Sequence, residues 1–320
     1  MAFHGYLLCH NVIHCAERLG AVDLKQIEYF VHVAELGSFT RAAALLSIAQ
    51  PALSRQVRSL EVELAQTLLY RNGRGVSPTE AGKRLVAHGR GILLQVERAR
   101  EDLEGVRDAP VGRVVVGAPP TVAKMLALPL VKEFQARYPR AMLSIVEGLT
   151  SYATEWLLMG RVDIAVLHNP AASPALTFVP LARERLCLIS PAPRGKTRSQ
   201  APVRMRDLPG YPLIIPSQPH AFRMQVDTHL ARLGLKANVV LEIDGVPAML
   251  DLVHQGYGHA ILPANRMLVD RQRRTFAARA IIEPRLVSTL ALAISAQRPT
   301  TPLTRHTLEL LKTIVPHLLR

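Results

Sequence analysis

The chain has 320 residues, of which 49% are hydrophobic, and a formal net charge of +14. This length is enough for two or three domains with cores of their own. The sequence has no run of about 20 apolar residues, which a membrane-spanning helix needs, and its three cysteines are too few for a disulfide framework. We therefore expect a cytoplasmic protein that does not span a membrane.

The positive charge does not by itself identify a nucleic-acid-binding protein. Residues 23–108 hold 12 basic and 11 acidic side chains, whereas residues 110–320 hold 26 and 13. The excess therefore lies in the C-terminal part, where it forms a dispersed, solvated surface or attracts an anionic ligand. A role in DNA binding has to be argued from motifs instead.

The segment 1–22 precedes the first predicted helix and lacks the basic region of a signal peptide. Two interpretations are open. Two cysteines and two histidines of this segment are of types that bind soft metals: Cys9, His10, His14 and Cys15. Alternatively, the native chain begins at Val22 and the segment is translated leader sequence. We favour the second interpretation and expect no metal site.

Apolar spacing predicts three helices after this segment. The first covers 24–36 and stops at Gly37, and Ser38 caps a second helix that begins at the next residue. The third helix begins near Pro51, because proline is accepted in the first turn of a helix. Only residues 47–49 separate the second helix from the third.

Two short helices joined by a tight turn are typical of a helix-turn-helix, whose later helix enters the DNA major groove. Arg55 and Arg58 suit base edges or phosphates. Gln50 and Ser54 lie near the N-terminus of the third helix, where base contacts concentrate. An ordinary three-helix bundle with a solvated, charged face fits these residues equally well.

The sequence "RNGRG" at 71–75 separates two apolar segments and predicts the turn of a β-hairpin. Such a hairpin would be a wing that presents Arg71 and Arg74 to the DNA backbone or minor groove. Thr79 is then placed to cap a long helix. A wing after three helices favours the DNA-binding interpretation over the plain bundle.

Residues 24–85, "LKQIEYFVHVAELGSFTRAAALLSIAQPALSRQVRSLEVELAQTLLYRNGRGVSPTEAGKRL", resemble the winged helix-turn-helix of LysR-type bacterial transcriptional regulators along nearly the whole segment. Within that family, "SIAQPALS" and "GVSPTEAGK" are similar to the branch typified by the nitrogen assimilation control regulator. The resemblance implies a sequence-specific activator or repressor that binds double-stranded DNA as a homodimer or homotetramer and acts with RNA polymerase. It further implies control by a small-molecule co-inducer, with no cofactor and no enzymatic activity.

The same resemblance implies which residues contact DNA. They are Thr40, Gln50, Pro51, Ser54 and Arg55, with Arg71 and Arg74 in the wing. The chain departs from the family pattern in two places. Ala49 stands where many members have a hydroxyl residue that caps the third helix, and Ala65 with Gln66 replaces a usual glycine after it.

Residues 79–108 predict a linker helix with a heptad pattern. One seam is formed by Leu85, Ile92, Ala99 and Val106, and the other by Gly82, Gly89, Val96 and Leu103. We predict dimerisation through Leu85, Ile92, Val96, Ala99 and Leu103. A helix packed on its own C-terminal domain would show the same pattern.

Beyond a break at Pro110 and Gly112, apolar segments such as "RVVVGA" and "RLCLISP" predict buried strands. They alternate with helical patterns, which favours an open α/β sheet in two lobes. The family resemblance implies a periplasmic-binding-protein-like effector domain over 111–320. Lobe I would cover about 111–183 and 287–320, and lobe II about 184–286. The DNA-binding domain would cover 23–81. Two crossings between the lobes would form a hinge that a ligand could move.

Ligands of such sheets bind beyond the carboxyl ends of the strands, where helix N-termini favour anions. The residues at these positions are Thr121, Thr150, Ser151, His168, Ser217 and Gln218. His220 and Arg223 would add positive charge. We expect a small anionic effector, although each hydroxyl would also serve merely to cap its helix.

Other classes of protein fit less well. The chain has no phosphate-binding glycine loop, metalloprotease histidine pair or hydrolase nucleophile elbow, so we do not expect an enzyme. A solute-binding protein would share the C-terminal architecture but would lack the winged module. A constitutive DNA-binding regulator that needs no effector is the main alternative.

Overall fold

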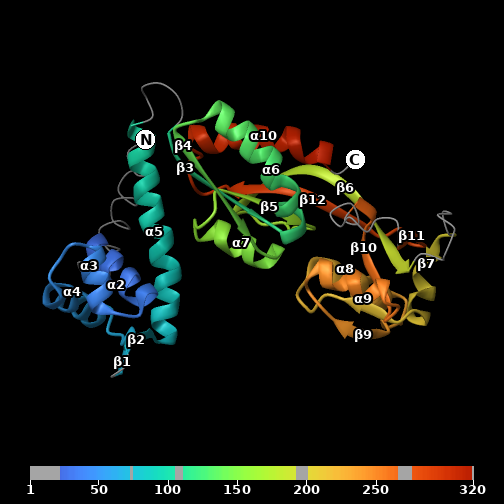
Figure 1. Ribbon diagram of the computed structural model, residues 1–320, viewed down its shortest axis with the longest axis horizontal. Coiled ribbons are helices and arrows are strands. Elements are labelled where there is room, and N and C mark those ends of the chain that lie inside the picture. The colour runs from blue at the N-terminus through green and yellow to red at the C-terminus, as the bar shows by residue number, and fades with distance from the viewer. Residues whose placement is uncertain (1–21, 73–74, 105–110, 192–200, 266–275, 319–320) are drawn as a thin grey trace, which may run out of the picture. The chain divides into compact units, whose positions relative to one another are not determined.

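The computed structural model describes residues 22–72, 75–104, 111–191, 201–265 and 276–318. The chain divides into two compact units at Arg100 (Figure 1). In the part of the chain described, no helix is long and apolar enough to cross a membrane. The predicted mainly α N-terminal region and α/β C-terminal region are both confirmed.

The N-terminal unit is a small helical domain with a β-hairpin. Its elements are α2 (Leu24–Leu36), α3 (Phe39–Leu45), α4 (Gln50–Glu63), β1 (Leu69–Asn72), β2 (Gly75–Pro78) and α5 (Glu80–Glu104). The apolar residues at helical spacing form one core, in which Phe30, Leu53 and Leu60 are fully buried. β1 and β2 pair antiparallel, so the predicted wing is present.

Short-range signals set the ends of these helices. Gly37 ends α2 with a φ of +62°, the left-handed conformation that glycine adopts without strain. The Ser38 hydroxyl caps α3 by accepting a hydrogen bond from the Arg41 amide at 3.3 Å. The Thr79 hydroxyl accepts from the Gly82 amide at 3.0 Å at the start of α5. All three predicted helix ends are therefore confirmed.

Helix α4 lacks the usual cap and the usual exit. Ala49 is its N-cap residue and makes no side-chain cap hydrogen bond, and Pro51 lies in the first turn. At the other end, Ala65 adopts a φ of +49° where a glycine would be unstrained. The Glu61 carboxylate compensates, because it accepts hydrogen bonds from the amides of Leu68 at 2.9 Å and Leu69 at 3.1 Å. The Glu61 side chain thus fixes the backbone that follows α4.

Replacing Ala65 with glycine is expected to stabilise the N-terminal unit. The left-handed conformation costs a residue with a Cβ about 1–2 kcal/mol, of which the greater freedom of unfolded glycine removes part, leaving a net gain of about 0.5–1 kcal/mol. Circular dichroism during urea unfolding measures the gain. Trp156, the single tryptophan, lies in the other unit, so an unchanged fluorescence transition is the internal control. A lower stability would contradict the assignment of strain to Ala65.

The C-terminal unit contains a sheet whose first half forms lobe I. Its strands lie in the order β4 (Ala141–Glu147), β3 (Gly112–Ala118), β5 (Ile164–His168), β12 (Val287–Ser295) and β6 (Leu176–Pro191). Strand β3 runs parallel to both β4 and β5, whereas β12 is antiparallel to β5. The three helices of this lobe are α6 (Pro120–Arg137), α7 (Thr150–Leu158) and α10 (Pro302–Leu318).

The helices of lobe I cover both faces of its sheet (Figure 1). Val114 and Val116 of β3 face α6 and α10, while Val115 between them faces α7. Because successive side chains of a strand point to opposite faces, a strand buried on both sides has to be continuously apolar. This is why "RVVVGA" is recognisable as a buried strand.

Lobe II continues the same sheet from the end of β6. Its elements are β7 (Val203–Arg204), η2 (Met205–Gly210), β8 (Leu213–Ile215), α8 (Ala221–Arg232), β9 (Val239–Glu242), α9 (Val246–His254), β10 (His259–Pro263) and β11 (Phe276–Ile282). Strand β6 pairs with β12 in lobe I and with β10 and β11 in lobe II. A core from Leu186 to Leu286 belongs to this lobe alone.

Two strands of this sheet differ from the prediction. Strand β6 is 16 residues long, whereas the sequence predicts only its apolar end, "RLCLISP". Exposed residues interrupt the half-buried ones in its first part, which therefore lacks the apolar run of a buried strand. Strand β11 is not predicted because half-buried alanines and an arginine interrupt its apolar pattern.

Candidate DNA-binding surface and effector site

One face of α4 is exposed while the opposite face is buried. Leu53 and Val57 are completely buried in the core, whereas Arg55 and Arg58 are exposed. Neither arginine makes a hydrogen bond or ion pair with another of the residues that the structure describes. The helix therefore presents its guanidinium groups outward, as reading base edges or phosphates requires.

The other predicted DNA-contacting residues surround this face. Gln50 and Pro51 are exposed at the uncapped N-terminus of α4, Ser54 one turn later is half-buried, and Thr40 is exposed on α3. At the start of α4, Pro51 has no N–H and the Ala52 amide donates to the Ala49 carbonyl at 2.9 Å, so the Gln50 amide is the donor left for a phosphate. Ala49 thus leaves the helix end open toward the surface that the flanking residues form.

Arg71 of the wing folds back onto the helices. Its guanidinium donates to the Ser54 hydroxyl at 3.4 Å and lies 3.7 Å from the Glu61 carboxylate. It also covers the ring of Phe39 at 4.9 Å from the ring centre. Arg71 therefore ties the wing to α3 and α4, a structural role that the sequence does not reveal. Arg74 lies outside the described residues.

Two glycines of the predicted heptads pack against other parts of the N-terminal unit. A Cβ on Gly82 would lie 2.1 Å from the carbonyl oxygen of Leu68, and a Cβ on Gly89 would lie 2.9 Å from methyl groups of Ile27 and Val31. Both glycines therefore allow α5 to pack closely on its own DNA-binding domain. Leu85 packs against the same core.

The remaining predicted dimer contacts lie further along α5. Ile92 is 40% exposed, Val96 is half-buried and Ala99 is exposed. The side chain of Leu103 lies outside the described residues, as do residues 105–108 of the expected helix. The predicted seam thus divides into an N-terminal part used within the chain and a later part with accessible apolar groups.

The C-terminal unit contains a pocket of about 680 Å³ between the two lobes. Lobe I contributes the first turns of α7 and the residues after β5, and lobe II contributes one face of α8. The lining residues with polar side chains are Thr150, Ser151, Thr154, His168, Asn169, Ser173, Gln225, Thr228 and His229. Phe178 and Met224 are among the apolar ones. Three of the six predicted effector residues therefore come together here, namely Thr150, Ser151 and His168.

His168 forms the buried base of this pocket. Its side chain is 4% exposed, and its Nδ1 lies 3.2 Å from the Ser288 hydroxyl and 3.8 Å from the Glu184 carboxylate. Its backbone amide donates to the Thr150 hydroxyl at 3.0 Å, which ties the end of β5 to the start of α7. The rings of His168 and Phe222 are in edge-to-face contact, with 4.8 Å between their centres. His168 is thus held by both lobes and by the strands that join them.

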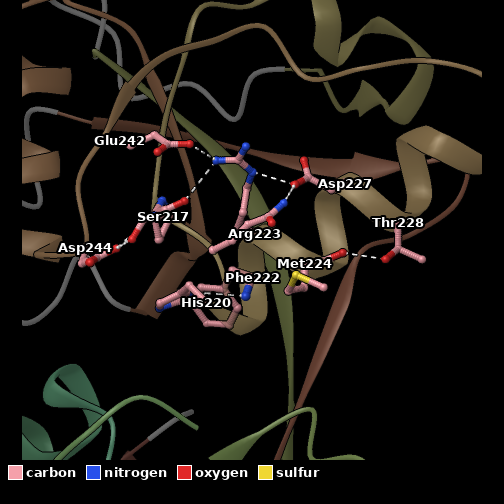
Figure 2. A network of polar contacts seen from close by, with 11 residues as sticks. Ser217, His220, Phe222, Arg223, Met224, Asp227, Thr228, Glu242 and Asp244 are labelled. Carbon is pink, nitrogen blue, oxygen red and sulfur yellow. Dashed lines mark hydrogen bonds and ion pairs between the residues drawn. The ribbon is translucent and has the colours of Figure 1, made fainter. Parts of the chain in front are cut away.

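Ser217 and Gln218 do not line the pocket, contrary to the prediction. The Ser217 hydroxyl donates to Asp244 at 2.7 Å, and the Ser217 amide donates to the same carboxylate at 2.9 Å (Figure 2). The side-chain amide of Gln218 donates to the Asp227 carboxylate at 3.0 Å. Both residues therefore bind carboxylates of their own lobe. Thr121, half-buried at the start of α6, is also absent from the lining.

The positive charge expected beside these residues is already neutralised. The Arg223 guanidinium donates to Asp227 and to Glu242, each at 2.7 Å (Figure 2). Burial lowers the pKa of His220, which favours the neutral form of the ring. Asp227 lies one turn further along α8, an i,i+4 partner of Arg223, whereas Glu242 comes from the end of β9 and no local pattern connects it with Arg223. An anion would find no unpaired cation in this network.

No aspartate, glutamate, lysine or arginine belongs to the described residues that line the pocket. Nor do three or more metal-ligating side chains gather anywhere in the described ranges. The cysteine and histidine residues considered for a metal, at positions 9–15, lie outside those ranges. The pocket thus offers hydroxyl, amide and imidazole groups against an apolar wall.

A winged helix-turn-helix joined to a two-lobed α/β domain with an inter-lobe pocket defines the class of ligand-binding transcriptional regulators. Residues 24–83 match the family described as "Bacterial regulatory helix-turn-helix protein, lysR family", and residues 107–315 match the LysR substrate binding domain. The chain belongs to the LysR family of DNA-binding transcriptional regulators. It is therefore a regulator and not an enzyme.

Individual relatives agree with this assignment. The chain is 32% identical to the nitrogen assimilation regulatory protein nac of Escherichia coli over 92% of its length and 95% of the relative. It is 30% identical to the HTH-type transcriptional regulator BbuR of Bordetella bronchiseptica, over 85% and 83% of the two chains. The resemblance to the nitrogen assimilation branch is thus confirmed as a similarity.

Solved structures show the same fold. A full-length OxyR variant from Pseudomonas aeruginosa has a TM-score of 0.66 at 24% identity and covers 92% of this chain and 94% of its own. CbnR, a LysR family transcriptional regulator, has a TM-score of 0.65 at 23% identity, with 93% and 99% covered. At these identities the likeness concerns the fold alone.

Proposed function

We propose that the protein reads its operator through α4, using Thr40, Gln50, Pro51, Ser54, Arg55 and Arg58. The support is the exposed arginine pair on a helix whose opposite face is buried and whose N-terminus is open. Arg74 would extend the contact from the wing. A homodimer or homotetramer that joins through Ile92, Val96 and Ala99 would present two such helices to paired half-sites, as DNA-binding dimers do. RNA polymerase in the cytoplasm would be its further partner.

We propose in addition that a small effector binds in the pocket between the lobes. The observation that carries this proposal is that Thr150, Ser151 and His168 of lobe I face Gln225 and His229 of lobe II across one pocket. Because no cationic side chain belongs to its described lining, the effector carries at most one negative charge and has an apolar body. Its carboxylate or carbonyl would accept hydrogen bonds at the N-terminus of α7. In this proposal lobe I covers residues 111–183 and 287–320, and lobe II covers residues 184–286.

Filling the pocket tests its role. Replacing exposed Ala172, a lining residue, with tryptophan is expected to weaken effector binding at least tenfold, equivalent to about 1.4 kcal/mol, because the bulky ring occupies the ligand's volume. Calorimetry with amides, monocarboxylates and dicarboxylates of one carbon skeleton would measure affinity and rank charge. Operator affinity without ligand should not change.

The matched control is Leu128→Trp, at a residue that is 79% exposed and does not line the pocket. Equal affinity of the Ala172 variant and the wild type would place the effector elsewhere. Tighter binding of the dicarboxylate than of the monocarboxylate would contradict the charge limit. Operator binding that responds to no compound would favour a constitutive regulator and would leave the DNA-binding half of the proposal intact.

A further inference from the structure

The side chain of Gln225, which lines the pocket, forms hydrogen bonds that join the two lobes. Gln225 lies on α8, and two other residues of this helix, Phe222 and Val226, are in the core of lobe II. Its carboxamide oxygen accepts from the Asn169 side chain of lobe I at 3.2 Å. Its carboxamide nitrogen donates to the carbonyl oxygen of Val287, the first residue of β12, at 2.6 Å. One amide thus holds lobe II to lobe I and to a strand that connects them.

The partner of Gln225 is itself held in place. Asn169 has a φ of +46°, which asparagine tolerates better than most residues with a Cβ. Its side-chain oxygen accepts from the Thr289 amide at 2.7 Å, and its own amide donates to the Thr289 carbonyl at 2.8 Å. The carboxamide of Asn169 is therefore anchored to β12 at one end and offered to lobe II at the other.

We propose that Gln225 is the positioning residue that sets the angle between the lobes when the pocket is empty, and that an occupant acts by taking over its hydrogen bonds. This inference rests on the proposed effector function of the pocket, whose lining includes both Gln225 and Asn169. A ligand between the lobes lies against the same two amides. A ligand group that forms a hydrogen bond with one of these two side chains breaks the bond between them, and this loosens the contact that sets the angle of the lobes.

The strength of this contact suits a switch. Two neutral hydrogen bonds of this kind shift an equilibrium by roughly 5- to 150-fold in total, which is also the usual range of coupling between an effector site and a second site. A much stronger contact would resist a small ligand, and a weaker one would not define the angle of the empty protein. The contact between His168 and Phe222 would remain when the amide bonds are lost.

The experiment measures the distance between the lobes in the full-length protein without any ligand. Spin labels are attached at exposed Gln135 of lobe I and exposed Lys236 of lobe II, both changed to cysteine after replacement of the three native cysteines. Labelled chains are diluted with unlabelled ones so that each oligomer holds one labelled chain. Pulsed electron spin resonance of Gln225→Ala should then show a second distance population, raised at least about fivefold over the parent.

Two further variants make the result specific. Thr228 also lines the pocket, about one turn further along α8, and its hydroxyl donates to the Met224 carbonyl of the same helix. The Thr228→Val variant should therefore show the same distance distribution as the parent. Gln225→Glu keeps the size but places an acceptor against the Val287 carbonyl, and it should behave like Gln225→Ala. Hydrogen exchange at the Thr289 amide should rise about tenfold in both Gln225 variants.

An unchanged distance distribution in both Gln225 variants would overturn the proposal even if the pocket binds an effector. Equal broadening in Thr228→Val would overturn it as well, because it would show a general loosening of α8. Effector binding by the Ala172→Trp variant tests the proposed function. It does not bear on the distance between the lobes in the ligand-free protein. The two proposals therefore fail separately.

Discussion

Replacing Gly82 with alanine is expected to destabilise the N-terminal unit by about 3 kcal/mol, because its added Cβ would make the shortest contact found for any glycine in the described ranges. The added Cβ would lie 2.1 Å from the Leu68 carbonyl oxygen, a backbone atom that cannot rotate away. That oxygen also accepts a hydrogen bond from the Thr79 amide at 2.9 Å. Moving it therefore strains both the wing and the cap of α5.

Urea unfolding followed by circular dichroism measures this loss. The fluorescence of Trp156 reports the C-terminal unit and should keep its midpoint, since the clash is confined to the N-terminal unit. Gly210→Ala is the matched control, because a Cβ there meets no atom within 4 Å. A Gly82 variant as stable as the wild type would show that α5 does not pack against the Leu68 backbone as described.

Replacing Arg55 with alanine is expected to weaken specific operator binding by about 1–3 kcal/mol and to relax the preference at one base pair. The guanidinium is exposed on α4, and its charge is not engaged by any neighbour within the described ranges. A bidentate contact to a base would be lost together with its discrimination. Because the residue lies outside the core, the free energy of unfolding should hardly change.

Operator binding measured on a set of single-base variants, beside random DNA at the same salt concentration, distinguishes a base contact from a phosphate contact. Lys25→Ala removes the same charge from an exposed position at the start of α2 and is the control for long-range attraction. Equal loss of affinity on specific and random DNA would assign Arg55 to a phosphate. Unchanged specific binding would remove it from the interface.

The difference between expectation and structure is sharpest in the effector domain. Thr150, Ser151 and His168 lie together as predicted, because the first two follow β4 and His168 ends β5, and the carboxyl ends of parallel strands converge. Ser217 follows a strand in the same way, yet it binds Asp244. The position of a residue after a strand indicates where its hydroxyl lies, but it does not indicate whether that hydroxyl is hydrogen-bonded to another side chain.

The heptads of α5 show the same difference. The spacing indicates correctly that one face of the helix is buried, but it does not indicate by what. Gly82 and Gly89 accommodate the backbone of Leu68 and the side chains of α2. The period of an amphipathic pattern describes a face and carries no information about the identity of its partner.

The sequence by itself determined the helix ends, the wing and the alternation of strands and helices, because those depend on residues within a few positions of one another. Ser38 and Thr79 each cap a helix by bonding an amide three residues later. Only the tertiary structure decided how polar side chains are shared. Ser217 meets a carboxylate 27 residues away, and Asn169 meets Gln225 at a separation of 56. Such pairs form when the sheet brings distant segments together, and no local pattern records them.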